Sequence, residues 1–162
     1  MKLWRDGTEP HYRELNAAKK TGGGMQNVLV LVVEDEALIQ LEIETALQEA
    51  GFSTDAAATG KAAIAKLEAV QEIRGLVTDV NLGNAISGWD VARRARELAP
   101  DLPVVYATSV SMAEWSVNGV PNSVLIAKPY VPAQIITALS QLLNAVGAQP
   151  QATGAGGQSV LA

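Results

Sequence analysis

Residues 76–83 read Leu-Val-Thr-Asp-Val-Asn-Leu-Gly, so a carboxylate, Asp79, directly follows a short apolar run and precedes a turn-like segment. Three other apolar runs end as abruptly, in the acidic residues 34–36, in the hydroxyl of Thr108 and in the amine of Lys128. Apolar runs of this length, bounded by polar residues, are typical of buried strands. We expect Asp79 to face solvent at a strand end, and the other polar groups to lie at the same edge of one sheet.

Strand and helix patterns alternate along the chain. We expect strands at 28–33, 52–57, 76–78, 104–107 and 124–127. Apolar residues recur at helical spacing over 39–50, 63–70, 91–98 and 135–143, and a capping-box pattern at Ser111 and Glu114 begins a short further helix. This alternation predicts an α/β fold with a doubly wound, five-stranded parallel sheet covered on both faces. Ligands of such sheets bind beyond the carboxyl ends of the strands.

Length and composition narrow the class of protein. The 162 residues suit one domain, and 17 acidic against 12 basic residues give a net charge of −5, which argues against a nucleic-acid-binding surface. There is no cysteine, so disulfides and thiolate metal sites are excluded. No apolar stretch approaches the roughly 20 residues of a membrane-spanning helix, and no signal peptide is evident. We therefore expect a cytoplasmic protein without membrane association.

The two ends of the chain differ from its centre. Residues 1–24 show no sustained period and end in a glycine run, so we expect a flexible N-terminal extension and a natural start at Met25. Residues 148–162 are rich in Gly, Gln, Ala and Ser and are expected to form a flexible C-terminal tail. The folded domain is expected to span 25–147.

Three carboxylates are expected to meet at the sheet edge, those of Glu34, Asp35 and Asp79. Carboxylates crowded into one cleft repel each other unless a cation neutralises them. Magnesium prefers oxygen ligands and often binds beside phosphoryl groups, and Asn81 could add a backbone carbonyl. A zinc site is disfavoured, because the one histidine, His11, lies in the N-terminal segment.

Lys128 and Thr108 complete a site suited to phosphoryl transfer. An ammonium offsets the charge of the transferring oxygens, and a hydroxyl donates a hydrogen bond to one of them. Asp79 is the expected nucleophile, because aspartate can form an acyl phosphate.

The ordered motifs resemble the receiver domain of two-component response regulators. The resemblance covers about 28–145 and rests on Val-Val-Glu-Asp-Glu at 32–36, Val-Thr-Asp-Val-Asn-Leu at 77–82, Pro-Val-Val-Tyr-Ala-Thr-Ser at 103–109, and Lys-Pro at 128–129. It implies a flavodoxin-like sheet with strand order 2-1-3-4-5, a bound magnesium ion, and phosphotransfer from a histidine kinase or a histidine phosphotransfer protein.

The resemblance also implies a role for each site residue. Asp79 would be the phosphoacceptor, Glu34 and Asp35 the metal-binding acids, Thr108 the switch hydroxyl and Lys128 the pocket lysine. A cis Lys128–Pro129 bond would direct Lys128 into the pocket.

One departure concerns the switch. Leu125 stands three residues before the lysine, where receivers usually carry a tyrosine or phenylalanine, so the usual coupling between threonine and aromatic ring is in doubt. We expect a stand-alone signalling protein, rather than an enzyme, that is a monomer or weak homodimer. Its altered surface would be the fourth helix, the fifth strand and the fifth helix, including Met112 and Trp115.

Two alternatives stay open. A pseudo-receiver would bind partners without being phosphorylated. A phosphatase with an aspartate nucleophile would need a second acid two residues after Asp79, where the chain has Asn81. The sequence does not indicate the kinase or the downstream protein target.

Overall fold

The computed structural model describes residues 28–148. The expected extension at 1–24 and, apart from Ala148, the expected tail at 148–162 lie outside the described residues. Within residues 28–148, five strands alternate with five helices, as predicted.

The strands form one parallel sheet. They are β1 (Leu29–Val33), β2 (Ser53–Ala57), β3 (Ile73–Thr78), β4 (Val104–Thr108) and β5 (Val124–Ala127). Their spatial order is β2-β1-β3-β4-β5, and every pairing is parallel, which confirms the predicted topology. Because β1 lies beside both β2 and β3, the carboxyl ends of β1 and β3 are neighbours at the point where the strand order reverses.

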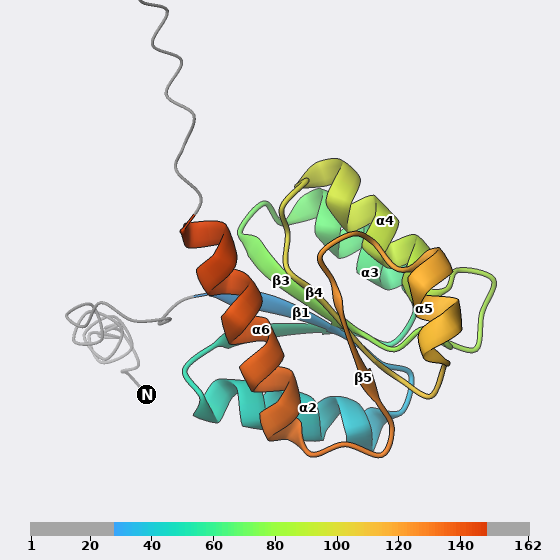
Figure 1. Cartoon of the computed structure of the whole chain (residues 1–162), viewed down its shortest axis with the longest axis horizontal. Coiled ribbons are helices and arrows are strands. Elements are labelled where there is room, and N and C mark those ends of the chain that lie inside the picture. Colours follow the sequence, from blue (N-terminus) through green and yellow to red (C-terminus); the bar gives the residue numbers. More distant parts are fainter. Residues whose placement is uncertain (1–27, 149–162) are drawn as a thin grey trace, which may run out of the picture.

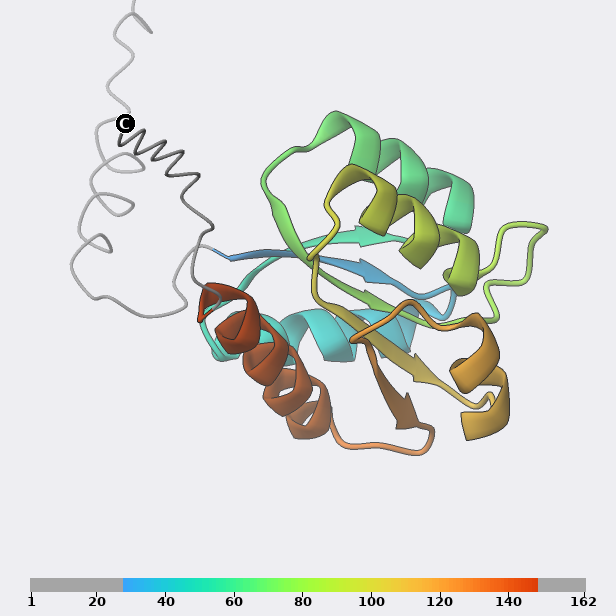
Figure 2. The ribbon, with the colours of Figure 1, turned by 45° about the horizontal axis from the view of Figure 1, so that its top comes forward.

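The helices cover both faces of the sheet (Figures 1 and 2). They are α2 (Ala37–Glu49), α3 (Gly60–Ala69), α4 (Gly88–Leu98), α5 (Met112–Asn118) and α6 (Pro132–Gly147). One face packs against α2 and α6, through an apolar cluster that includes Leu47 and Leu139. The other face packs against α3 and α4, with Trp115 of α5 at its margin. No helix within 28–148 combines the length and the apolar character needed to cross a bilayer.

Local sequence signals account for several element boundaries. The expected capping box at Ser111 is present, because its hydroxyl accepts a hydrogen bond from the N–H of Glu114. Gly51 adopts a φ of 96° after α2, as expected for a left-handed helix end. Strand β3 begins at Ile73, three residues before the predicted start. Arg74 and Gly75 interrupt its apolar run. The register with β1 shifts at Arg74, and the regular pairing resumes at Gly75.

Candidate functional site

The polar residues predicted to meet do lie at one edge of the sheet. Glu34 follows β1, Asp79 follows β3, Thr108 ends β4 and Lys128 follows β5. Backbone hydrogen bonds tie these ends together: the N–H of Asp79 donates to Val33 at 3.0 Å, and that of Lys128 donates to Thr108 at 2.9 Å. The position of each functional side chain is therefore set by the ladder of the sheet itself.

Asp79 is buried, which corrects the expectation that it faces solvent. Only 7% of its surface is exposed, because the loop after β3 and the start of α4 close over it. Its Oδ1 atom accepts hydrogen bonds from the N–H groups of Val80 at 2.6 Å and Asn81 at 3.2 Å. The backbone thus holds one carboxylate oxygen, and the other, Oδ2, is left for side-chain partners.

Lys128 joins two of the acids. Its ammonium donates to Asp79 Oδ2 at 2.8 Å and to Glu34 Oε2 at 3.2 Å. Burial alone would lower the pKa of Lys128, but the hydrogen bonds and negative charges of Asp79 and Glu34 outweigh burial and raise that pKa overall. The lysine therefore stays charged and offsets part of the negative charge. The Lys128–Pro129 bond is cis, as the resemblance implied.

Glu34 is the most deeply enclosed of the acids, with 1% of its surface exposed. Burial raises its pKa, and the N–H of Glu36, which donates to Oε1 at 3.1 Å, together with Lys128 counteracts only part of that rise. The negative charge of Asp79 also raises it. A carboxylate that is costly to charge in this position gains from any added cation.

The three predicted metal-binding acids form one cluster. Glu34, Asp35 and Asp79 each offer a carboxylate oxygen, and these atoms all lie within 4.8 Å of one another. Asp35 is exposed, so the cluster opens to solvent on that side. Three hard oxygen donors with one accessible side fit a magnesium ion, which keeps several of its own waters. Lys128 supplies too little charge to neutralise all three.

Two hydroxyls in the described part of the chain are buried without a hydrogen-bond partner, those of Thr108 and Tyr130. Thr108 is fully buried at the end of β4, next to the strand that carries Asp79. A buried hydroxyl without a partner is costly, and a catalytic role or a bound ion or water is among the explanations for such a group. Tyr130 follows the cis proline, and burial raises its pKa to about 12. Sequence reasoning did not single out Tyr130.

Asn81 and Leu125 complete the predicted set. Asn81 lies in the exposed loop after Asp79, and the role of its carbonyl as a metal ligand stays a prediction. Leu125 is half-buried on β5, opposite Tyr106 of β4. The ring of Tyr106 is buried against Trp89, with centroids 4.6 Å apart. The aromatic residue paired with Leu125 across the sheet is thus inside the core, on the strand of Thr108.

Gly88 is a positioning residue that sequence reasoning missed. Its N–H donates to the carbonyl of Val80 at 2.8 Å, which brings the start of α4 onto the loop after Asp79. A Cβ atom at this position would lie 2.0 Å from the backbone oxygen of Asp79. The glycine next to the capping residue Ser87 was the available signal, but only the tertiary contact shows that no side chain fits there.

Replacing Gly88 by alanine should therefore displace the Asp79 loop. We expect Gly88→Ala to lower the free energy of unfolding by about 2–3 kcal/mol, because the clash is with backbone rather than with a movable side chain. Urea unfolding measures this loss. Gly147→Ala is the matched control, since a Cβ there meets nothing within 4 Å and alanine favours a helix. Equal stability of both variants would contradict the assignment.

Comparison with known proteins places these residues in a family. A family model described as the response regulator receiver domain matches residues 30–140. A response regulator receiver protein from Sinorhizobium medicae has a solved structure that is 43% identical, with a TM-score of 0.72, over 75% of this chain and 98% of that one.

Two further proteins, one similar in sequence and one similar in fold, are less closely related to this chain. A protein named "Probable transcriptional regulatory protein TcrX", from Mycobacterium tuberculosis, is 31% identical over 80% of this chain and 56% of its own length. The receiver domain of a Pseudomonas aeruginosa sensor histidine kinase, solved with magnesium in its active site cleft, has a TM-score of 0.63 at 22% identity over 73% of this chain and 98% of that one. The latter likeness concerns the fold alone. The chain spans about half the length of the curated relatives that it matches.

Proposed function

Because this chain belongs to the response regulator receiver domain family, we propose that it accepts a phosphoryl group on Asp79 from a phosphohistidine and signals through altered protein binding. The observation that carries the proposal is the convergence of Lys128 on Asp79 and Glu34, at 2.8 and 3.2 Å. The proposed donor is a histidine kinase or a histidine phosphotransfer protein, and the cytoplasm is the proposed location of the reaction. The chain is then a phosphoacceptor rather than a catalyst acting on other substrates.

The reaction needs one nucleophilic oxygen and charge compensation. We assign the attack to Asp79 Oδ2, because backbone N–H groups already hold Oδ1. The oxygen–phosphorus bond forms as the phosphorus–nitrogen bond of the donor breaks, and the imidazole leaves with the bonding electron pair. Lys128 would transfer its hydrogen bond from the carboxylate to a phosphoryl oxygen, and the Thr108 hydroxyl would donate to another.

The acid cluster would hold a magnesium ion. Glu34, Asp35 and Asp79 provide the carboxylates, and the Asn81 carbonyl is a further proposed ligand. When bound, the ion neutralises negative charge on the carboxylates and on the phosphoryl oxygens. Glu34 also anchors Lys128, so the lysine and the proposed metal site share one acid.

Incubation with acetyl phosphate and magnesium tests the function directly. Intact mass should increase by one phosphoryl group, and the increase should depend on magnesium. A mass unchanged under conditions that label another receiver would refute the proposal and support a pseudo-receiver. Neither alternative is favoured: the clustering of Glu34, Asp35 and Asp79 supports phosphate acceptance, and Asn81 supplies no second acid for a phosphatase.

The Thr108 hydroxyl should matter for signalling and little for folding. The hydroxyl is buried and has no hydrogen-bond partner among the described residues, so Thr108→Val should keep the free energy of unfolding or raise it by about 1 kcal/mol. The same change should abolish the shifts of amide resonances in β4 and α5 that phosphorylation induces. Thr108→Ser should retain them, and Thr137→Val on the exposed face of α6 is the matched control. Normal shifts in Thr108→Val would exclude Thr108 as the sensor.

Magnesium affinity should fall in acid because protons compete for Glu34. Burial raises the pKa of Glu34 above its ordinary value of 4.5, so the native state holds this proton more tightly than the unfolded chain does. Protonation therefore stabilises the metal-free fold at low pH, and that contribution is lost as pH rises through the native pKa. Magnesium affinity changes in the opposite direction, because the ion binds the deprotonated form of Glu34. This affinity should fall by about tenfold per pH unit below the native pKa of Glu34.

Calorimetric titration with magnesium at neutral pH and near pH 5 measures this dependence. Glu36→Gln should keep the wild-type profile, because its exposed side chain lies outside the acid cluster. Glu34→Gln should bind magnesium weakly at both pH values. A wild-type affinity that is the same at both pH values would contradict the role of Glu34.

The proposed output surface is formed by α5, β5 and α6. Met112 is 65% exposed, whereas Trp115 is half-buried and its indole N–H donates to Ser123 at 3.0 Å. The hydroxyl of Tyr106 accepts a hydrogen bond from the N–H of Val120, and Val120 lies in the segment that precedes β5. Strand β4, which ends at Thr108, therefore has a direct contact with the segment leading into β5. A change at Thr108 has a short route to this surface.

A further inference from the structure

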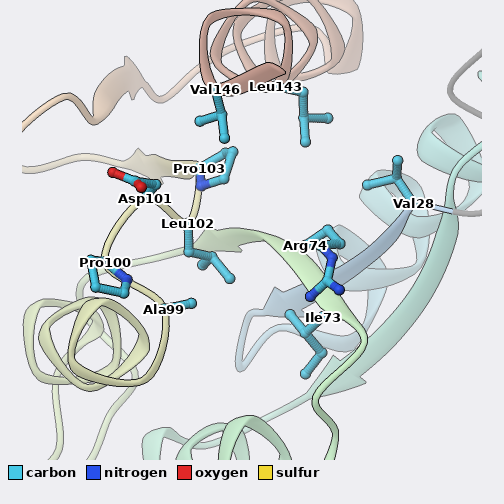
Figure 3. Close-up of a pocket in the computed structure, with 10 residues that line it drawn as sticks. All are labelled: Val28, Ile73, Arg74, Ala99, Pro100, Asp101, Leu102, Pro103, Leu143 and Val146. Atoms are coloured by element: carbon cyan, nitrogen blue, oxygen red, sulfur yellow. The ribbon is translucent and has the colours of Figure 1, made fainter. Parts of the chain in front are cut away.

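A cavity of about 590 Å³ lies at the end of the sheet opposite the acid cluster (Figure 3). Its lining includes Val28, which precedes β1, Ile73 and Arg74 at the start of β3, and Pro103, which precedes β4. Leu143 and Val146 in the last turns of α6 point into it (Figure 3). The cavity is thus built from the amino ends of the central strands and the end of the last helix, and it lies outside the proposed phosphoryl site.

One wall of the cavity is preformed. The segment between α4 and β4 is held by the Arg96 guanidinium, whose Nε donates to the carbonyl of Leu102 at 2.7 Å. The N–H of Leu102 donates to Ala99 at 3.0 Å. Prolines at both ends of this segment restrict it further. An occupant would therefore meet an ordered surface and would not need to order it.

The lining is chiefly apolar, and part of it is uncovered. Val146 is 42% exposed, and Leu143 and Val28 are half-buried. Of the two charged residues of the lining, Arg74 donates to the backbone oxygen of Gln71, and the carboxylate of Asp101 points away from the cavity (Figure 3). The chemistry of the cavity selects an occupant with aliphatic side chains and no charge.

The chain itself carries such a segment close by. Residues 149–162 contain no charged residue, and Val160 and Leu161 are their only branched aliphatic residues. The intervening part is composed of Gln, Gly, Ala, Ser, Thr and one proline. This segment follows α6 directly, three residues after Val146 of the cavity wall.

We propose that Val160 and Leu161 bind in this cavity, so that residues 149–162 fold back on the amino end of the sheet. At about 3.5 Å per residue the connecting residues can span about 40 Å, so the cavity is well within reach. A connection of this length gives an effective concentration on the order of millimolar, at which even modest apolar burial is populated. Residues 1–27 are a poorer occupant, because they carry eight charged residues and because their Leu3 and Trp4 precede Val28 by 25 and 24 positions in the sequence.

Disulfide trapping tests the proposal cleanly, because the chain has no cysteine of its own. Full-length protein with Ser159→Cys and Asp101→Cys places one thiol beside the anchors and one on the exposed rim of the cavity. The reference protein adds Val160→Ser and Leu161→Ser. Under mild oxidation, the apolar tail should close the intramolecular disulfide about tenfold faster than the polar tail. Both proteins share the Asp101 change, so a folding defect would affect both rates alike.

Other results would overturn the proposal. Equal closure rates would show that the anchors do not bind. In a second protein, Asn84→Cys replaces Asp101→Cys as the acceptor thiol, and it lies near the acid cluster at the other end of the sheet. If its disulfide with Ser159→Cys closes equally fast, the tail contacts the domain without selecting the cavity. A predominant intermolecular disulfide would assign the cavity to a second copy of the chain. The cavity would be assigned to the N-terminal segment by two results together. The disulfide would close faster when Leu3→Ser and Trp4→Ser are added, and its closure rate would not change with Val160→Ser and Leu161→Ser.

An independent readout needs no cysteine. Amide resonances of Arg74, Leu102 and Val146 should shift between wild type and Leu161→Asp, while Ala152→Asp should leave them unchanged. Identical resonances in all three proteins would also overturn the proposal.

Discussion

Replacing Asp79 by asparagine is expected to abolish phosphoryl incorporation from acetyl phosphate or from a cognate kinase. Asparagine keeps the size of the side chain and can still accept hydrogen bonds from Val80 and Asn81 through its amide oxygen. The Oδ2 atom beside Lys128 becomes an amide nitrogen, which is no longer a nucleophile. The variant should therefore fold and yet show no increase in intact mass.

The fold of Asp79→Asn needs its own measurement. Loss of the negative charge removes repulsion within the acid cluster, but it also takes from Lys128 its shorter hydrogen bond. These effects oppose each other, so we expect a cooperative unfolding transition like that of the wild type. Asp101→Asn, at the opposite end of the sheet, should be labelled normally. Equal labelling of Asp79→Asn and wild type would show that phosphate is carried elsewhere.

Replacing Lys128 by methionine is expected to cause the largest loss of stability at this site. The ammonium is the counter-charge of Glu34 and Asp79, whose side chains are 1% and 8% exposed. Removing one partner of a buried ion pair leaves an uncompensated charge and typically costs 3–5 kcal/mol. Because the lysine side chain is 21% exposed, we expect about 3 kcal/mol at neutral pH.

The pH dependence of this loss identifies its cause. Burial raises the pKa of Glu34, and without the ammonium that opposes this rise Glu34 holds its proton still more tightly in the native state than in the unfolded chain. Its protonation then stabilises the fold below the unfolded pKa, and this contribution disappears as pH rises through the native pKa. Lys128→Met should thus recover stability in mild acid, and magnesium should restore part of it at neutral pH by supplying positive charge.

Urea unfolding at neutral pH and near pH 5, with and without magnesium, measures these effects. Lys61→Met on the exposed face of α3 is the matched control and should change stability by less than about 0.5 kcal/mol. A loss in Lys128→Met that is independent of pH and of magnesium would point to lost packing of the aliphatic stem. If Lys128→Met also fails to be phosphorylated, the result would indicate that the ammonium interacts with the phosphoryl group during its transfer.

Much of the site could be predicted because each residue marks the end of an element. Glu34, Asp79, Thr108 and Lys128 interrupt apolar runs, and such interruptions are visible without knowledge of the fold. The exposure of Asp79 could not be predicted, because it depends on the approach of α4 through Gly88, nine residues later. The start of β3 was misplaced because Arg74 and Gly75 hide a strand whose pairing partner lies more than forty residues away in the sequence.

The sequence by itself determined the alternation of strands and helices, the chemical type of each strand end and, through its ordered motifs, the family. Local hydrogen bonding and apolar periodicity suffice for these features, because they involve residues a few positions apart. Only the tertiary structure decided how the strand ends meet. Lys128 contacts Asp79 and Glu34 across 49 and 94 residues of sequence. The burial of Asp79, the raised pKa of Glu34 and the unpartnered hydroxyl of Thr108 all follow from distances between segments that only the packed sheet brings together.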